Sequence, residues 1–322
     1  MKRLKSRAIL CASLPTLCFV LGRGLIAQGG PPSPIPDREG MYQHLKKDQE
    51  IAGQDLYPHF AHRCLVDQTY RRTISRSIQA TGAIEPLKVF DNLYFVGQNA
   101  VSAWAITTSA GIIVIDTLNS AEEAKTYITG GLAKIGLNPA DIKYAILTHA
   151  HGDHVNGAAY LQDTYAAQTM ASKADWEAIR GLKRGLDIED GQRLAIGDTT
   201  ITFYVTPGHT AGTVSMIFST TDGGQNHVVG MFGGLGTPAS GADKKTHIAS
   251  LARFRTLAGA AGVDSLIANH QTQDLSLAKL ELLRLRRPGD ANPYVIGTGA
   301  FLRYLDIQGE CTAYAMAREG QR

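Results

Sequence analysis

The stretch Thr148-His149-Ala150-His151-Gly152-Asp153-His154 places three imidazoles and one carboxylate within seven residues. It directly follows the apolar run 144–147, which is typical of a buried strand. Because successive side chains of a strand point to opposite faces, His149 and His151 can aim in the same direction where the strand ends. The carboxylate and the third histidine lie in the following turn and can serve a second ion. Imidazole and carboxylate groups together predict a site for zinc or a similar divalent metal.

Two further histidines follow apolar runs in turn-like surroundings. His209 lies within Thr206-Pro207-Gly208-His209-Thr210, and His270 follows Leu266-Ile267-Ala268-Asn269. Surface histidines without an ion are the alternative, and short motifs need this kind of context to be convincing. His270 has the weakest pattern, because a single histidine after an apolar strand is often only a hydrogen-bonded structural residue. Thr210 is expected to bond a main-chain group or a group behind the ligands.

Taken together, His149-x-His151-x-Asp153-His154, Gly208-His209-Thr210-x-Gly212 and the distal His270 resemble the metallo-β-lactamase superfamily. The resemblance begins near residues 87–94, passes through 111–117 and reaches at least His270. Along the chain, strand and helix patterns succeed one another in two similar halves. Both observations predict an α/β fold, an αββα sandwich of two mixed sheets flanked by helices.

The resemblance also implies the ligand sets. It assigns His149, His151 and His209 to a first zinc. It assigns Asp153, His154 and His270 to a second zinc. Two Zn²⁺ ions would share a hydroxide that attacks a carbonyl polarised by the first ion, and Asp153 would orient that hydroxide. No covalent serine or cysteine intermediate is expected.

Residues 228–235 depart from many relatives. Glyoxalase II-type and lactonase-type hydrolases carry an aspartate here that bridges both metals, whereas this chain has Gly233 or Gly234. Loss of that carboxylate, with the histidine-rich ligand set, resembles the subclass B3 metallo-β-lactamases. The glycines also remove the serine usual at this point in subclass B3. Recognition of the antibiotic's carboxylate is therefore left unexplained.

We expect a secreted di-zinc hydrolase that uses a metal-bound hydroxide to open a cyclic amide, foremost a β-lactam ring, and so confers antibiotic resistance. One alternative is a lactone, thioester or other ester hydrolase of the same superfamily, and another is a non-catalytic exported metal-binding protein. The partner is a small-molecule substrate. Candidate pocket walls are Trp104, Tyr160, Gly233, Gly234 and the rest of segment 233–240. Tyr57, His59, Phe60 and His62 could cover the pocket, although packing is their default role.

The N-terminus has the pattern of a secretory leader. Four basic residues precede the apolar stretch 8–21, and small residues lie around Ala27. We expect residues 1–27 to be a signal peptide, 28–40 a Pro/Gly-rich linker, 41–85 a helical N-terminal extension and 86–322 the hydrolase domain. Pro15 interrupts the apolar stretch, which disfavours a permanent membrane anchor. The mature protein is expected in the periplasm or secreted, without stable membrane association.

Charge bears on whether the protein binds nucleic acid, and cysteine content bears on whether it forms a disulfide. Removing residues 1–27, which hold five basic and no acidic side chains, turns the formal charge from +3 to −2. Without a concentrated basic face, nucleic acid is not an expected ligand. Of the four cysteines, Cys64 and Cys311 lie beyond the leader. They can form a disulfide in an oxidising compartment or remain buried thiols, and the sequence leaves both open. Oligomeric state cannot be read from the sequence.

Overall fold

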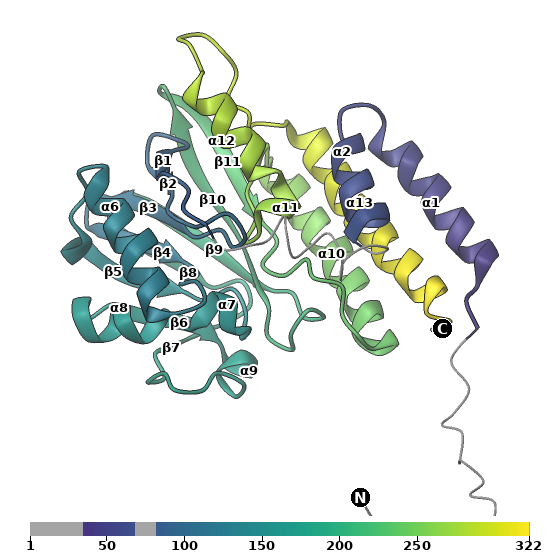
Figure 1. Ribbon diagram of the computed structural model, residues 1–322, viewed down its shortest axis with the longest axis horizontal. Coiled ribbons are helices and arrows are strands. Elements are labelled where there is room, and N and C mark those ends of the chain that lie inside the picture. Colours follow the sequence, from purple (N-terminus) through teal and green to yellow (C-terminus); the bar gives the residue numbers. More distant parts are fainter. Residues whose placement is uncertain (1–34, 68–81, 322) are drawn as a thin grey trace, which may run out of the picture. The chain divides into compact units, whose positions relative to one another are not determined.

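Figure 1 shows a computed structural model of the protein, which describes residues 35–67 and 82–321. The expected signal peptide and most of the expected linker lie outside these described residues. Within the described ranges, no helix has the length and apolar content needed to cross a membrane.

The first sheet has seven strands, which follow one another in chain order. They are β1 (Leu87–Lys88), β2 (Leu93–Phe95), β3 (Trp104–Thr108), β4 (Gly111–Ile115), β5 (Ile142–Ile146), β6 (Gln168–Ser172) and β7 (Leu186–Ile188). Strands β1 to β4 pair antiparallel, and β4 to β7 pair parallel. The parallel strands need crossover connections, which the helices between them provide. Because β4 to β6 run in parallel, their carboxyl ends meet at one edge of the sheet.

The second sheet has five strands in the order β12-β11-β10-β9-β8. They are β8 (Arg193–Ile196), β9 (Thr199–Val205), β10 (Val214–Asp222), β11 (Gln225–Met231) and β12 (Ser265–Leu266). Strands β10 and β11 form a hairpin, whose turn has Gly223 and Gly224 at φ 58° and 84°. Two successive residues at positive φ favour glycine at both positions. The short β12 pairs parallel with β11 and leads to His270.

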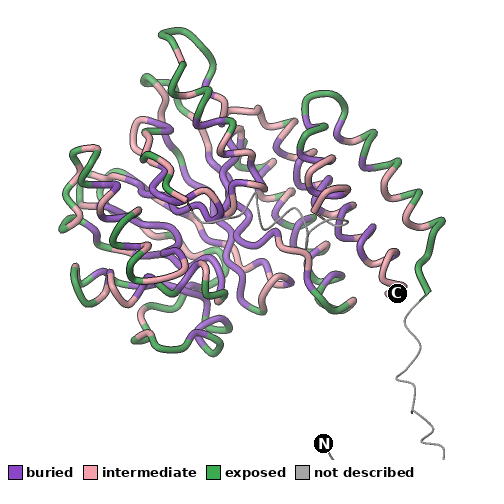
Figure 2. The backbone as a smooth tube through the Cα atoms, in the orientation of Figure 1, coloured by how far each residue is buried: buried purple, intermediate pink, exposed green. Residues whose placement is uncertain are grey.

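The two sheets pack face to face around one hydrophobic core. Phe95, Trp104 and Ile115 from the first sheet share this core with Phe203 and Met216 from the second. Figure 2 shows buried residues concentrated along the strands and exposed residues on the helices and turns. The predicted αββα sandwich is therefore confirmed.

Helices cover the outer faces of both sheets and fill the connections. Two helices lie on the first sheet. One is a continuous helix made of α5 (Ala121–Glu123), η2 (Ala124–Thr129) and α6 (Gly130–Lys134), and the other is α8 (Ala158–Tyr165). On the second lie α10 (Gly241–Ala261) and α13 (Thr298–Arg318). Shorter helical segments are η3 (Pro139–Asp141), α7 (Gly152–Val155), α9 (Lys173–Trp176), α11 (Gln271–Asp274) and α12 (Ser276–Arg284).

Side-chain caps explain where two of these helices begin. Ser120 Oγ accepts a hydrogen bond from Glu123 N at 3.1 Å, as its capping pattern predicts. Ser240 Oγ accepts likewise from Asp243 N at 3.0 Å, and α10 therefore starts at Gly241.

The N-terminal extension packs against the C-terminal helix α13. Up to Asp67, where its described part ends, it consists of α1 (Arg38–Ala52), α2 (Tyr57–Phe60) and the π-helical segment η1 (Ala61–Asp67), and residues 68–81 of the expected extension lie outside the described residues. Helix α1 begins at Arg38 behind the cap Asp37, so residues 38–40 of the expected linker are helical. Cys64 of η1 and Cys311 of α13 form a disulfide, which resolves the two possibilities left open by the sequence. The extension therefore belongs to the same compact unit as the sandwich.

Candidate metal centre

The first predicted ligand set converges at the carboxyl end of β5. Ligand atoms of His149, His151 and His209 lie within 4.8 Å of one another. The Nε2 atoms of His149 and His209 are 3.2 Å apart. Nitrogens bound to one tetrahedral zinc at its usual bond length lie about 3.3 Å apart, so this spacing fits the ion. His149 is buried and His151 is exposed, which leaves one side of the set open.

The second predicted set lies beside the first. The Nε2 atoms of His154 and His270 are 3.2 Å apart, and Asp153 Oδ2 lies 3.4 and 3.5 Å from them. The rings of His149 and His154 connect the two sets, with centroids 4.1 Å apart. Both three-residue sets therefore have donor types and spacings that suit zinc.

Hydrogen bonds on the far nitrogen orient four of the five histidines. Nδ1 of His149 donates to Gly233 O at 3.0 Å, Nδ1 of His209 to Gly236 O at 2.7 Å, and Nδ1 of His270 to Ala100 O at 3.1 Å. Because a carbonyl oxygen can only accept, these contacts put the proton on Nδ1 and leave Nε2 free for a metal. His154 Nδ1 instead contacts Asp116 Oδ2 at 2.8 Å.

Asp116 supports the second donor set, although the sequence motifs did not single it out. Fully buried, it accepts hydrogen bonds from Thr148 N and Thr148 Oγ1 at 2.8 and 2.9 Å, in addition to its contact with His154. Its φ of 61° is a strained conformation for a non-glycine residue. Its place in the sequence could have indicated this role, because a carboxylate at the end of β4 lies beside β5, the strand that leads to the ligands.

Asp175 ties together the two loops that carry the first ligand set. Its carboxylate accepts from Ala150 N at 2.9 Å, Gly212 N at 2.8 Å and Thr210 Oγ1 at 2.7 Å. Burial raises the pKa of this carboxyl. The predicted role of Thr210 is thereby confirmed: it binds the group that holds the neighbouring ligand loop.

Burial keeps most of the ligand histidines neutral. It lowers the pKa of His149 and His209 well below the ordinary value and that of His270 to about 4. For His154 burial also favours the neutral form, but the charge and hydrogen bond of Asp116 outweigh it and raise the pKa to about 9. A proton therefore competes with a metal for His154.

Both ligand sets open into a pocket of about 200 Å³. Its other walls come from three regions, namely η1 (His62, Arg63, Asp67), the loop after β11 (Leu235, Gly236) and the segment around α11 (Asn269, Thr272, Gln273). Of the residues considered as covers in the N-terminal extension, His62 lines the pocket, whereas His59 is buried against Tyr304.

Several expected pocket walls lie elsewhere. Trp104 is fully buried in the core and donates Nε1–H to Ala268 O, so it cannot contact a substrate. Tyr160 bonds Thr129 and Tyr165 over the outer face of the first sheet. Gly233 and Gly234 are buried, and the next two residues, Leu235 and Gly236, line the pocket instead.

Packing explains the glycines of this loop. A Cβ at Gly233 would lie 1.8 Å from Val214 O, and a Cβ at Gly234 would lie 2.8 Å from the His209 ring. Neither distance is compatible with a side chain unless the main chain moves. The close approach of the main chain to a ligand histidine therefore requires glycine.

An αββα sandwich with two histidine-rich donor sets at one sheet edge is the architecture of a metal-binding protein. The family model of the metallo-beta-lactamase superfamily matches residues 96–223. Over this segment the chain matches the superfamily that the sequence motifs predicted.

Among curated relatives, a probable polyketide biosynthesis zinc-dependent hydrolase of Bacillus subtilis (strain 168) is 38% identical over 81 residues, 25% of this chain and 36% of that protein. A hydroxyacylglutathione hydrolase of Cereibacter sphaeroides (strain ATCC 17025 / ATH 2.4.3) is 36% identical over 74 residues, 23% of this chain and 28% of that protein. The matched part thus spans about a third of these relatives.

Solved structures match over more of the chain. A subclass B3 metallo-beta-lactamase of Bradyrhizobium japonicum is 27% identical with a TM-score of 0.60, over 76% of this chain and 94% of that one. A class B3 di-zinc metallo-beta-lactamase from an Alaskan soil metagenome shares the fold at 21% identity and a TM-score of 0.59, over 71% of this chain and 93% of that one.

Proposed function

We propose that this protein is a zinc-dependent hydrolase that opens a cyclic amide, with β-lactams as its substrate class. The convergence of two three-residue ligand sets on one pocket carries this proposal. The likeness to a subclass B3 metallo-beta-lactamase over most of the chain supports the choice of substrate. Residues 1–27 have the composition of a signal peptide, which supports a periplasmic or secreted enzyme.

The ligand sets define where metal would act. His149, His151 and His209 would hold one zinc, and Asp153 and His154, with His270, would hold the other. Two zinc ions, when bound, supply a Lewis acid for a carbonyl and lower the pKa of water towards neutrality.

The protein's own groups position the reactants and move protons. Burial alone would raise the pKa of Asp153, but its hydrogen bond to His154 and the positive charge of that imidazole lower it overall, so the carboxylate is ionised at neutral pH. Asp153 lines the pocket beside the other members of its set and can therefore orient a water molecule and accept its proton. The carbonyls of Gly233 and Gly236 keep the rings of His149 and His209 from rotating during the reaction.

A second candidate is hydrolysis of a thioester or another ester at the same site. It is favoured by the curated relatives, among which are hydroxyacylglutathione hydrolases.

A substrate panel separates these candidates. Purified mature protein is assayed on a chromogenic cephalosporin, a lactone and a thioester, each with zinc and after chelator treatment. Cephalosporin opening that chelator abolishes supports the proposal, and selective ester cleavage supports the second candidate. Tight zinc binding without turnover of any substrate would contradict both and favour a non-catalytic metal-binding protein.

Matched variants connect turnover to the site. His149→Ala and His151→Ala each remove a ligand and should abolish turnover. His227→Ala serves as the control, because His227 pairs with Asp264 outside the pocket. If His149→Ala and His151→Ala retained wild-type turnover, the assignment of this pocket as the active site would be wrong.

A further inference from the structure

The loop 233–237, Gly-Gly-Leu-Gly-Thr, holds two metal ligands through its main chain. The carbonyl oxygens of its first four residues each accept a hydrogen bond from a side chain elsewhere in the protein. Two donors are the ligands His149 and His209, which bind Gly233 O and Gly236 O. Three of the five residues are glycine, so the loop has few side chains and little intrinsic stiffness to keep its own conformation. Its position therefore depends on the groups that donate to it.

Three further donors hold the loop from behind. Asn269 Nδ2 donates to Gly233 O at 2.7 Å and His247 Nε2 donates to Gly234 O at 3.1 Å. Arg63 Nη2 donates to Leu235 O and to Thr237 Oγ1, the latter at 3.1 Å. Arg63 is the charged member of the five donors and precedes Leu235 by 172 residues. Its planar fork of N–H groups fixes two points of the loop at once, which a single donor cannot do.

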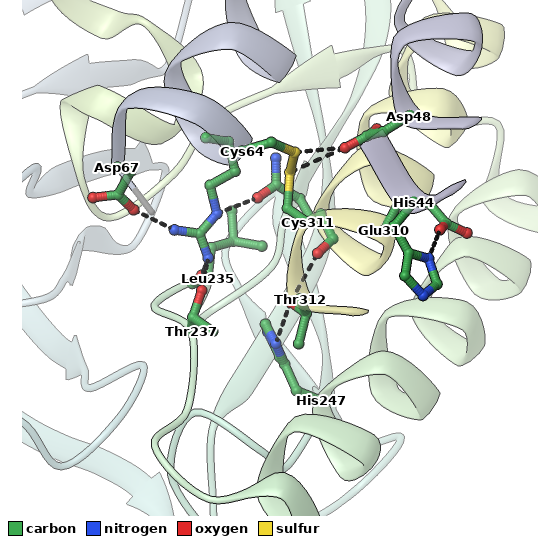
Figure 3. Close-up of a disulfide and its surroundings, with 12 residues drawn as sticks. His44, Asp48, Cys64, Asp67, Leu235, Thr237, His247, Glu310, Cys311 and Thr312 are labelled. Carbon is green, nitrogen blue, oxygen red and sulfur yellow. Dashed lines mark hydrogen bonds and ion pairs between the residues drawn. A yellow bond between two sulfur atoms is a disulfide. The ribbon is translucent and has the colours of Figure 1, made fainter. Parts of the chain in front are cut away.

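Arg63 is itself held rigidly in place. Only 5% exposed, it donates from Nε to Gln308 Oε1 at 2.9 Å and from Nη1 to Asp67 Oδ2 at 2.6 Å. The next residue, Cys64, is bonded to Cys311 of α13, the helix that also carries Gln308. Figure 3 shows the disulfide, with Leu235 and Thr237 near Asp67. The extension and α13 together thus determine where the guanidinium can lie.

We propose that Arg63 is a positioning residue of the first metal site, through which the disulfide-bonded N-terminal extension orients His209. The proposal rests on the zinc-binding function proposed above. Without this guanidinium, the loop loses its contacts at Leu235 and Thr237, and the Gly236 carbonyl between them, which fixes the His209 ring, is free to shift. Gly233 O remains held by Asn269. His154 and His270 of the second set are oriented by Asp116 and Ala100, so the second site is independent of the contacts that Arg63 makes.

This independence allows a selective test on the full mature chain. Zinc affinity is measured by competition with a chromophoric chelator in two backgrounds, His270→Ala, which leaves the first set complete, and His209→Ala, which leaves the second. Arg63→Met should weaken zinc binding at the first site by about 10- to 100-fold, the usual effect of removing a group that orients ligands. Arg63→Lys, which keeps one donor and the charge, should weaken it less. At the second site both variants should bind zinc as their background does.

Arg303→Met is the matched control. Arg303 of α13 also holds the N-terminal extension, by donating to Ile51 O and Asp55, but it does not contact the loop. Its variant should leave both zinc affinities unchanged. Unchanged first-site affinity in Arg63→Met would overturn the proposal. Equal weakening of both sites, or the same loss in Arg303→Met, would also overturn it, because that result indicates general destabilisation.

Two further measurements keep the outcome decisive. Thermal unfolding of each metal-free variant identifies any variant that does not fold. If Arg63→Met does not fold, the zinc affinity of Arg63→Lys is compared with that of its background instead. The visible spectrum of Co²⁺ in the first site reports ligand geometry, and it should change in the Arg63 variants but not in Arg303→Met; an unchanged spectrum would overturn the proposal. Failure of the proposed function would look different, since wild-type protein would then lack zinc binding or turnover whatever stands at position 63.

Discussion

Replacement of Asp48 tests how the disulfide region responds to pH. Asp48 lies on α1, is 1% exposed, and has Oδ2 at 2.5 Å from Cys64 Sγ and 3.1 Å from Cys311 Sγ (Figure 3). A disulfide sulfur carries no proton, so only the protonated carboxyl can donate in these contacts. Burial, and secondarily the charge of Glu310, raise the pKa of Asp48 from 3.8 to about 8.

The sign and size of the effect follow from this shift. Between pH 3.8 and about 8 the folded protein keeps a proton that the unfolded chain has released. Stability therefore falls as pH rises through this window and levels off above it. One pKa unit corresponds to about 1.4 kcal/mol, so Asp48 should lower the free energy of unfolding by about 5 kcal/mol between pH 4 and pH 8.

Asp48→Asn removes the titration and retains the shape of the side chain. Its amide N–H groups find only sulfur as an acceptor, which costs about 1–3 kcal/mol at every pH. The variant should therefore be less stable than wild type at pH 4 and more stable by about 2–4 kcal/mol at pH 8. Urea unfolding of the metal-free proteins from pH 4 to 9 measures this, with the exposed Asp163→Asn as the control. Parallel stability profiles for wild type and Asp48→Asn would refute the reasoning.

Three further changes probe the metal centre and its support. Asp116→Asn weakens the charge behind His154 and should lower zinc affinity at the second site by about 10- to 100-fold in the chelator competition assay. Gly236→Ala would put a Cβ 2.3 Å from His209 Cε1, so the variant should lower first-site zinc affinity and unfold at a lower temperature. Cys64→Ser opens the disulfide and should lower the free energy of unfolding by about 2–4 kcal/mol in guanidinium titration; an unchanged midpoint would argue against a structural role.

The ligand sets were predictable because most of their members are local in sequence. Four ligands lie within six residues at the end of one strand, and His209 follows another strand of the sandwich. Strand alternation and the direction of the parallel strands then bring them to one sheet edge. Whether Cys64 and Cys311 are bonded could not be deduced in this way, because 247 residues separate them and periodicity carries no information over that distance.

The sequence pattern predicted the pocket wall formed by the N-terminal extension less clearly than it predicted the metal ligands. His59 and His62 occur in the same short stretch, yet one is buried in the core and the other lines the pocket. No sequence pattern indicates the role of Arg63, because its partners on the loop are a main-chain carbonyl and a threonine hydroxyl that lie far away in the sequence. Bonds to main-chain carbonyls place no requirement on residue type at the accepting position, so a single sequence cannot reveal them.

The glycines at 233 and 234 bear on which residues can bind a carboxylate of the substrate. From the sequence they indicated the loss of an aspartate or serine that relatives use, but at Gly233 any side chain would clash with Val214 O. This main-chain path excludes such a group, so a substrate carboxylate must be met from other walls of the pocket. His62 lines the pocket, and burial lowers its pKa, so it is neutral and can donate one N–H.

We therefore expect His62→Ala to raise KM for a substrate that carries a carboxylate. Loss of one hydrogen bond to a charged group costs roughly 1.5 kcal/mol, which is about a 10-fold change in binding. The kcat should stay near the wild-type value, because His62 belongs to neither ligand set. A methyl ester of the same substrate is the control, and its KM should change little. An equal rise in KM for acid and ester would show that His62 shapes the pocket without recognising the carboxylate.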